Sequence, residues 1–262
     1  MIYLDNAATS WPKPDRVYET LGSFLQHSGA NPGRSGHRMA TSAAGMLDRT
    51  RNRIAALFNA PGPEQVIFTL NATDALNFAI KGALIAGDHA ISTVMEHNSV
   101  RRPLRAMESQ GVTTTKVPAD SEGFISVDDV RAAVRPNTQL IAVTHASNVN
   151  GAIQPIAEIA EIARENGALL LVDAAQTAGA IPIDIADMGI DLLAIPGHKA
   201  LMGPPGTGAL LIGDRVDLDD LNTVREGGTG GNSEEDTQPR ELPARYEAGT
   251  HNTVGIAALG AA

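Results

Sequence analysis

Residues 140–176, LIAVTHASNVNGAIQPIAEIAEIARENGALLLVDAAQ, contain the pattern from which the fold follows most directly. Two aliphatic runs, LIAVT (140–144) and LLLV (169–172), are separated by a helical pattern at about 155–166. Apolar runs without polar interruptions are typical of strands buried on both faces, and helices between such strands are typical of parallel sheets. This unit predicts an α/β protein with a mostly parallel sheet.

The same alternation extends over the rest of the chain. Further helical patterns lie at about 14–27, 38–59, 73–85 and 98–110. Further strand-like runs are VIFTL (66–70), HAISTV (89–94), TTTKV (113–117), LLAI (192–195) and ALLIG (209–213). We therefore predict a seven-stranded sheet sandwiched by helices.

This sheet is expected to form a large domain at residues 16–250, after an N-terminal active-site segment at 1–15. The polar residues 226–243 predict a long loop or an interface segment. An apolar helical pattern begins at 251–262 and reaches no stop signal, so it is expected to be the start of a linker helix, cut off before a small C-terminal domain.

Composition excludes several classes of function. The chain has 262 residues, a net charge of −10 and no cluster of basic residues, which argues against a nucleic-acid partner. No leader sequence and no apolar stretch of ~20 residues is present, so we expect a cytoplasmic protein without a membrane span. The absence of cysteine excludes thiolate ligands and cysteine nucleophiles within these residues, and the histidine spacing predicts no metal site.

Polar groups follow five of the apolar runs, at the end where each predicted strand finishes. Ligands of open α/β sheets bind at the carboxyl ends of the strands, so these groups are expected to converge. They are Asn71–Asp74, Glu96–Asn98, His145–Asn148, Asp173 with Gln176, and Gly197–Lys199.

Lys199 and Asp173 are the strongest candidates among these groups. A partly desolvated lysine at a sheet edge has a lowered pKa and can form a Schiff base, although most lysines on loops are surface residues. Asp173 follows an aliphatic run, where a buried carboxylate needs a partner such as a protonated pyridine nitrogen. Taken alone, Asp173 would be interpreted as a helix N-cap. The two residues together favour a cofactor site.

Three further motifs have two interpretations each. Asn71-Ala72-Thr73 opens a helix and predicts either a phosphate site or simple capping by Asn71 or Thr73. His97 predicts either stacking on a flat ring or a structural hydrogen bond. GPPGTG at 203–208 resembles the start of a Walker loop but lacks the required lysine, so a nucleotide-binding domain is a distant alternative.

The chain resembles a known family in segments spread from one end to the other. The segments are YLDNAAT (3–9), NPGRSGH (31–37), FTLNATDALN (68–77), MEHNS (95–99), HASNVNG (145–151), LVDAAQ (171–176), PGHK (196–199) and EAGTHN (247–252). In this order they resemble the class V aminotransferase family of fold-type I enzymes, which use pyridoxal 5′-phosphate (PLP), and within it the cysteine desulfurase and selenocysteine lyase-like proteins. The resemblance implies the large domain of the PLP-dependent transferase fold.

The resemblance also implies roles for single residues around the cofactor ring. Lys199 would hold PLP as a Schiff base, and Asp173 would be the partner of the pyridine nitrogen. His97 would stack on the ring, and Gln176 would bond the ring hydroxyl with Asn148 close by. The protonated ring would then act as an electron sink, and the displaced lysine would move protons.

A second group of roles concerns the phosphate. Thr73, the backbone of Ala72, and His198 would bind it, and Thr250 would reach the phosphate of a neighbouring subunit, which implies a homodimer. Relatives often carry a serine where this chain has Pro196, so one hydrogen-bond donor is absent here.

At the substrate side, the family implies that Asn6 and Ala7 line the site and that His37 lies beside the substrate. The implied function is cysteine desulfuration, from L-cysteine to L-alanine with a persulfide that a sulfur-acceptor protein would receive; selenocysteine cleavage and transamination are alternatives. The family's catalytic cysteine and substrate arginine match no residue up to Ala262, so we expect a fragment, the alternative being a PLP-binding remnant.

Overall fold

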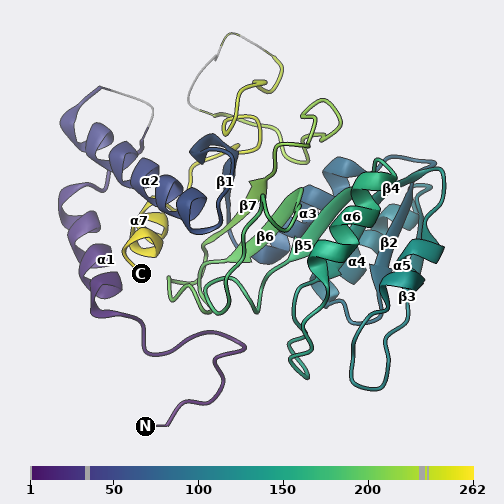
Figure 1. Cartoon of the computed structure of the whole chain (residues 1–262). Coiled ribbons are helices and arrows are strands. Elements are labelled where there is room, and N and C mark those ends of the chain that lie inside the picture. The colour runs from purple at the N-terminus through teal and green to yellow at the C-terminus, as the bar shows by residue number, and fades with distance from the viewer. Residues whose placement is uncertain (1, 33–35, 230–233, 235) are drawn as a thin grey trace.

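A seven-stranded sheet forms the middle layer of the fold, with strand order β1-β7-β6-β5-β4-β2-β3 (Figure 1). The computed structural model describes residues 2–32, 36–229, 234 and 236–262. The strands are β1 Val66–Thr69, β2 His89–Thr93, β3 Thr113–Val117, β4 Thr138–Thr144, β5 Leu169–Asp173, β6 Leu192–Pro196 and β7 Gly208–Ile212. The predicted strands are confirmed, with bounds that differ by at most two residues.

The sheet is mostly parallel, as predicted, and β7 is its antiparallel member. It pairs antiparallel with both β1 and β6, whereas β6, β5, β4, β2 and β3 pair in parallel. Residues 197–207, which connect β6 to β7, contain no crossover helix, so the chain turns back and pairs antiparallel. Because β1 and β6 both oppose β7, their carboxyl ends lie at the same edge of the sheet.

Seven α-helices are described around this sheet. They are α1 Asp15–His27, α2 Arg38–Leu57, α3 Ala72–Ala83, α4 Asn98–Glu108, α5 Val127–Ala133, α6 Ile156–Glu165 and α7 Thr253–Ala261, besides a 3₁₀ turn at Pro63–Gln65. The short helix α5 was not predicted, because seven residues are too few to show a helical period.

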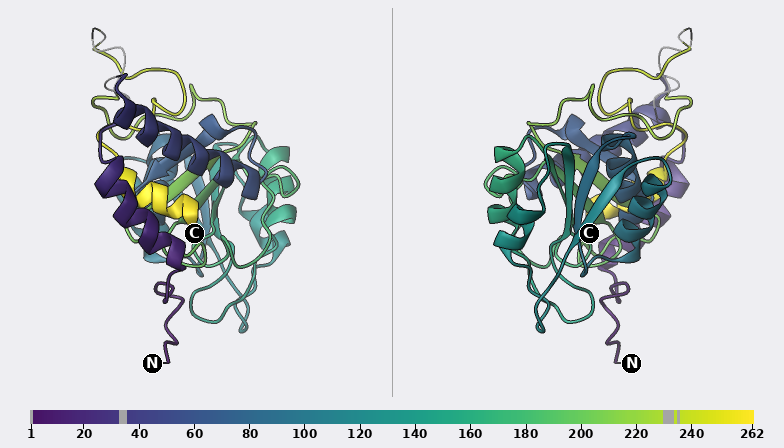
Figure 2. Two further views of the ribbon diagram at one scale, coloured as in Figure 1. Left: turned by 90° about the vertical axis from the view of Figure 1, so that its left-hand side faces the viewer. Right: turned by 90° about the vertical axis from the view of Figure 1, so that its right-hand side faces the viewer.

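Helices cover both faces of the sheet (Figure 2). Side chains that alternate along the strands form two cores, one on each face. In β4, Ile141 and Val143 pack into the core shared with α2, α5, α6 and α7, while Leu140 and Ala142 pack into the core shared with α3 and α4. The fold is therefore a three-layer α/β/α sandwich. None of the helices in the described ranges is long and apolar enough to cross a membrane.

The last helix, α7, packs against α1 and α2. The Thr50 hydroxyl on α2 donates a hydrogen bond of 3.1 Å to the carbonyl oxygen of Ile256. Residues 251–262, expected to begin a linker helix, are thus in contact with the rest of the domain. The described part of 226–243 holds neither helix nor strand, and residues 230–233 and 235 lie outside the described residues.

A buried ion pair holds the segment before α7 against the sheet. The Arg51 guanidinium donates two hydrogen bonds of 2.9 Å to the Glu247 carboxylate, which also accepts the Phe68 backbone N–H at 2.7 Å. Burial alone would raise the pKa of Glu247, but hydrogen bonds from His251 and Arg51 outweigh it and the pKa is lowered. These hydrogen bonds therefore keep the buried carboxylate in its charged form.

Gly208, at the start of β7, lies where no side chain fits. A Cβ there would lie 2.8 Å from the Cα and carbonyl carbon of Asn71 and from the carbonyl oxygen of Ile195. Because these are backbone atoms, we expect Gly208→Ala to lower the free energy of unfolding by about 1–3 kcal/mol, measured by urea denaturation. Gly22→Ala is the control, since a Cβ at that position in α1 meets nothing within 4 Å. Equal stability of the two variants would refute the expectation.

Candidate active site

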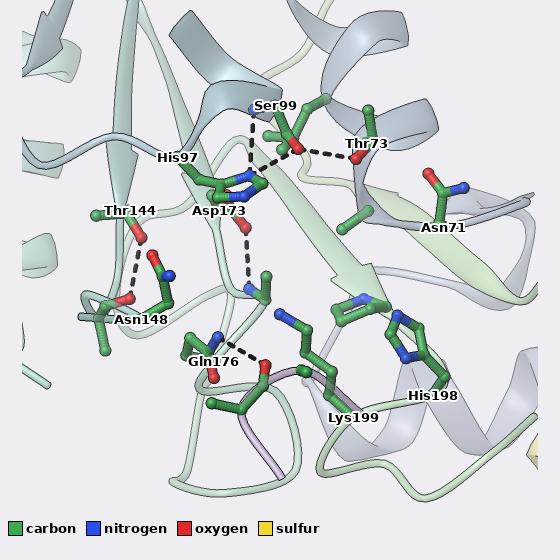
Figure 3. A pocket seen from close by; sticks show the side chains of 17 residues that line it. Asn71, Thr73, His97, Ser99, Thr144, Asn148, Asp173, Gln176, His198 and Lys199 are labelled. Carbon is green, nitrogen blue, oxygen red and sulfur yellow. Dashed lines mark hydrogen bonds between the residues drawn. The ribbon is translucent and has the colours of Figure 1, made fainter. Parts of the chain in front are cut away.

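The carboxyl ends of β1, β2, β4, β5 and β6 surround one cavity of about 350 Å³ (Figure 3). The five polar groups that follow these strands therefore converge, as the sequence predicts for parallel strands. The predicted site residues that line the cavity are Ala7, Ala72, Thr73, His97, Asn148, Asp173, Gln176, His198 and Lys199.

Lys199 follows β6 and extends its side chain into this cavity (Figure 3). Burial lowers the pKa of its ammonium group, and the nearby charge of Asp173 offsets part of that effect. In the described ranges, no hydrogen bond or ion pair involves the Lys199 amino group. The amine is thus positioned to react with a ligand in the cavity.

Asp173 ends β5 and is only 3% exposed. Its Oδ1 accepts the Ala175 backbone N–H at 2.9 Å, and no α-helix follows, so the residue is not a helix N-cap. Burial raises the pKa of this carboxyl, while the Ala175 N–H, His97 and Lys199 act in the opposite direction. A buried carboxylate in this state is stabilised by a cationic ligand.

The start of α3 forms another wall of the cavity. Asn71 caps the helix, because its side-chain oxygen accepts the Asp74 backbone N–H at 2.8 Å, so the capping interpretation is correct for Asn71. Thr73 takes no part in capping, and its hydroxyl lies 2.8 Å from the Ser99 hydroxyl. The first N–H groups of α3 have no partner within the helix and favour an anion.

His97 makes the structural hydrogen bond that was one of its two interpretations, and its stacking on a ring stays a prediction. It caps α4, since its Nδ1 accepts the Ser99 backbone N–H at 3.2 Å, and its ring also lines the cavity. The Ser99 hydroxyl lies 2.8 Å from the same Nδ1 and bridges His97 to Thr73. Because the cap holds the ring, His97 presents a fixed aromatic face to the cavity.

The N-terminal segment runs along the edge of the cavity. Gln176 donates a hydrogen bond of 3.1 Å to the Ala7 carbonyl oxygen, and the His198 carbonyl accepts from the Thr9 hydroxyl at 3.0 Å and the Lys13 amino group at 2.7 Å. Burial lowers the pKa of His198, and the charges of Lys199 and Lys13 lower it further. His198 is therefore a neutral imidazole at physiological pH.

Three predicted site residues lie elsewhere. Asn6 does not line the cavity and accepts the Trp11 backbone N–H at 3.2 Å. His37 caps α2, with its Nδ1 accepting the Ala40 N–H at 3.3 Å; residues 33–35 of its motif lie outside the described residues. Thr250 is exposed and lines two other small cavities. The structure thus does not bring these three to the cavity of Lys199.

Sequence reasoning missed several residues that build the site. Ser99 and Thr144 line the cavity, and Lys13 anchors the N-terminal segment. Glu96 belongs to one of the predicted polar groups but was given no role of its own, and it lies buried behind the cavity wall. Ser99, two residues after His97 at a helix start, carried the one available sequence signal, that of a helix cap region. Thr144 and Lys13 are placed at the site by contacts between parts of the chain that are distant in sequence.

The alternative nucleotide-binding site finds no support in the geometry. The loop at Gly203–Thr207 leads into β7, so GPPGTG lacks the following helix whose N-terminus would hold a nucleotide phosphate. Among the residues that the structure describes, no three His, Asp or Glu side chains are grouped to hold a metal ion.

Comparisons with known proteins find similar proteins over the whole length of the chain. The sequence profile of the family described as aminotransferase class-V matches residues 2–262. A probable cysteine desulfurase of Halalkalibacterium halodurans is 36% identical over 100% of this chain and 66% of its own length. The cysteine desulfurase IscS of Dictyoglomus turgidum is 37% identical over 100% of this chain and 62% of its own length.

Solved structures agree with the sequence relatives. The apo cysteine desulfurase of Thermococcus onnurineus NA1 superposes with a TM-score of 0.91 at 32% identity, covering 99% of this chain and 66% of that one. A structure described as SspA in complex with cysteine gives a TM-score of 0.87 at 33% identity, covering 99% and 71%. The chain thus spans about two thirds of the length of the relatives it matches.

Proposed function

Because this chain belongs to the aminotransferase class-V family, we propose that the protein carrying it is a PLP-dependent cysteine desulfurase. The substrate would be L-cysteine and the products L-alanine and a persulfide. The observation that carries the proposal is the convergence of Lys199 and the buried Asp173 on one cavity, beside the N-terminus of α3. The relatives named above support desulfuration over other reactions of the family.

The residues of the cavity fit PLP group by group. Lys199 would bind its aldehyde, Asp173 would face its ring nitrogen, and the flat ring of His97 would cover its ring. The N–H groups that open α3, with the Thr73 hydroxyl, would hold its phosphate. Pro196 also lines the cavity and has no donor to add to this phosphate site. When bound, PLP would supply an electron sink for the substrate carbon.

The chain's own residues would bind, orient and move protons. The lowered pKa of Lys199 leaves more of its amine unprotonated for covalent binding and lets Nζ carry a proton afterwards. The negative charge of Asp173 would keep a proton on a ring nitrogen. The hydrogen bond from Gln176 to the Ala7 carbonyl oxygen ties the N-terminal segment to the edge of the cavity.

The partners of this protein belong to the same proposal. SspA was solved with cysteine, and its likeness to this chain supports cysteine as the substrate here. Thr250 is exposed and away from its own cavity, which leaves it available to the phosphate of a second copy in a homodimer. A sulfur-acceptor protein would take the persulfide sulfur.

The test is product analysis with the protein expressed from its complete coding sequence and purified with PLP. We expect L-alanine and, with a thiol reductant, sulfide in equal amounts from L-cysteine. If only L-selenocysteine is cleaved, giving selenide, the protein is a selenocysteine lyase instead. If an amino acid is converted to its keto acid, the protein is an aminotransferase instead. No visible PLP absorbance at all would overturn the proposal.

A further inference from the structure

Glu96 is a buried carboxylic acid whose role is open. It follows β2 and is 4% exposed. Its Oε1 accepts the Thr93 hydroxyl at 2.7 Å and the Thr144 backbone N–H at 3.0 Å. Its Oε2 is buried without a hydrogen-bond partner in the described part of the chain. A carboxylate in such surroundings would be costly, because only one of its oxygens is solvated by the protein.

The comparison with Glu247 shows what Glu96 lacks. Both carboxyls are buried, but Glu247 contacts Arg51 and His251, whereas no cation contacts Glu96 in the residues that the structure describes. Burial raises the pKa of Glu96 to about 8; the bonds from Thr93 and Thr144 lower it, and the charge of Asp173 raises it. Glu96 is therefore protonated at neutral pH, with its proton on Oε2 because Oε1 already accepts two hydrogen bonds.

The position of Glu96 connects two walls of the cavity. It directly precedes His97, which caps α4, and it holds the backbone of Thr144. Thr144 is the register partner of Asp173 in the pair β4–β5, and Thr144, Asp173 and His97 all line the cavity. One side chain thus ties the turn that carries His97 to the strand end beside Asp173.

The titratable groups around Glu96 come from four strand ends. Asp173 on β5 acts directly on Glu96, and His97 lies next to Glu96 in the chain. Lys199 after β6 acts on Asp173, and burial lowers the pKa of His145 after β4, which leaves that imidazole neutral. An ionised Glu96 would therefore add a second negative charge close to Asp173 without a compensating cation.

We propose that Glu96 is a positioning residue of the cofactor site and acts as a neutral acid, fixing His97 and Thr144 without adding a second negative charge close to Asp173. The inference rests on the proposed function, since the ligand that Asp173 and His97 would hold is PLP. Glu96 itself does not line the cavity.

The test compares Glu96→Gln, which keeps the size and the Oε1 acceptor without an ionisable proton, with Glu96→Ala, which removes the acceptor. Glu158→Gln, at an exposed site on α6, controls for the loss of one carboxylate. The dissociation constant of PLP is measured by absorbance at pH 7 and pH 9.5 in the protein expressed from its complete coding sequence.

At pH 7 we expect Glu96→Gln to bind PLP within about threefold of the wild type, and Glu96→Ala to bind at least about tenfold more weakly, because the buried Thr144 N–H is left unpaired. At pH 9.5, where the wild-type Glu96 ionises, Glu96→Gln should bind at least about fivefold more tightly than the wild type. Equal losses in Glu96→Gln and Glu96→Ala at pH 7 would mean that Glu96 works as an anion and would overturn the proposal.

A second readout needs no cofactor. The pKa of Glu96 is about 8 in the fold against an ordinary 4.5, so its contribution to stability is complete below about pH 4.5 and is lost as the pH rises through 8. Glu96→Gln should flatten this decline in urea denaturation between pH 5 and pH 8, and Glu158→Gln should not. An unchanged slope in Glu96→Gln contradicts the neutral state. If the wild-type protein loses stability between pH 5 and pH 8 as expected but binds no PLP, the neutral state of Glu96 stands. The proposed function, and the role of Glu96 in the cofactor site, would then be overturned.

Discussion

Lys199→Ala is expected to abolish the covalent attachment of PLP and, with it, the visible absorbance of the purified protein. Lys199 is the lysine that lines the cavity, and burial lowers the pKa of its amine. Loss of the nucleophilic and proton-carrying amine is expected to reduce turnover of L-cysteine by at least about 10⁴-fold. The measurement is the absorbance spectrum after gel filtration, together with the rate of alanine formation.

Two lysines serve as controls for this variant. Lys116→Ala, at an exposed position on β3, should leave the spectrum unchanged. Lys13 lies near the site, but its amino group donates hydrogen bonds to the His198 carbonyl and to Ser10. Lys13→Ala should therefore keep the absorbance of covalently bound PLP even if the N-terminal segment loses these contacts. If this absorbance is retained in Lys199→Ala and lost in Lys13→Ala, Lys13 rather than Lys199 binds PLP covalently.

Asp173→Asn should reduce the turnover of L-cysteine by about 10²–10³-fold while PLP remains attached to Lys199. The asparagine oxygen can still accept the Ala175 N–H, so the variant removes the negative charge and keeps the local backbone. Without that charge, a ring nitrogen in the cavity is not held protonated. Steady-state kinetics and the absorbance spectrum measure the two effects.

Stability separates a chemical role of Asp173 from a structural one. Burial raises the pKa of this carboxyl, so removing its charge relieves a desolvation cost, and the cofactor-free Asp173→Asn protein should be at least as stable as the wild type. Asp48→Asn, at an exposed position on α2, should change neither turnover nor stability. A large drop in stability together with turnover would mean that Asp173 chiefly maintains the fold.

The strands could be predicted because their signal is local. An uninterrupted run such as LLLV at 169–172 needs only its own residues to indicate a strand buried on both faces. The position of β7 between β1 and β6 depends on pairing between distant residues, which no run of hydrophobic residues encodes. For the same reason the sheet was predicted as mostly parallel without identifying its antiparallel member.

In the site, too, some features could be predicted from local sequence and others could not. The convergence of Asp173, Lys199 and His97 follows from parallel strands that end at one edge, so it could be predicted once the strands were identified. Glu96 could not be singled out, because its protonation depends on burial and on the absence of a contacting cation such as the one that Arg51 provides for Glu247. These are properties of the packed structure. The roles predicted for the site residues stay predictions, and Thr250, Asn6 and His37 do not line the cavity.

The place of β7 between β1 and β6 has a consequence for the order in which the protein can fold on the ribosome. Roughly 140 residues separate Thr69 at the end of β1 from Gly208 at the start of β7, its partner in the sheet. At about 5–20 residues per second, the nascent β1 remains unpaired for on the order of ten seconds after its synthesis. The strands from β2 to β6 can pair in that time, and the wall of the cavity at Asn71, against which Gly208 packs, is completed last.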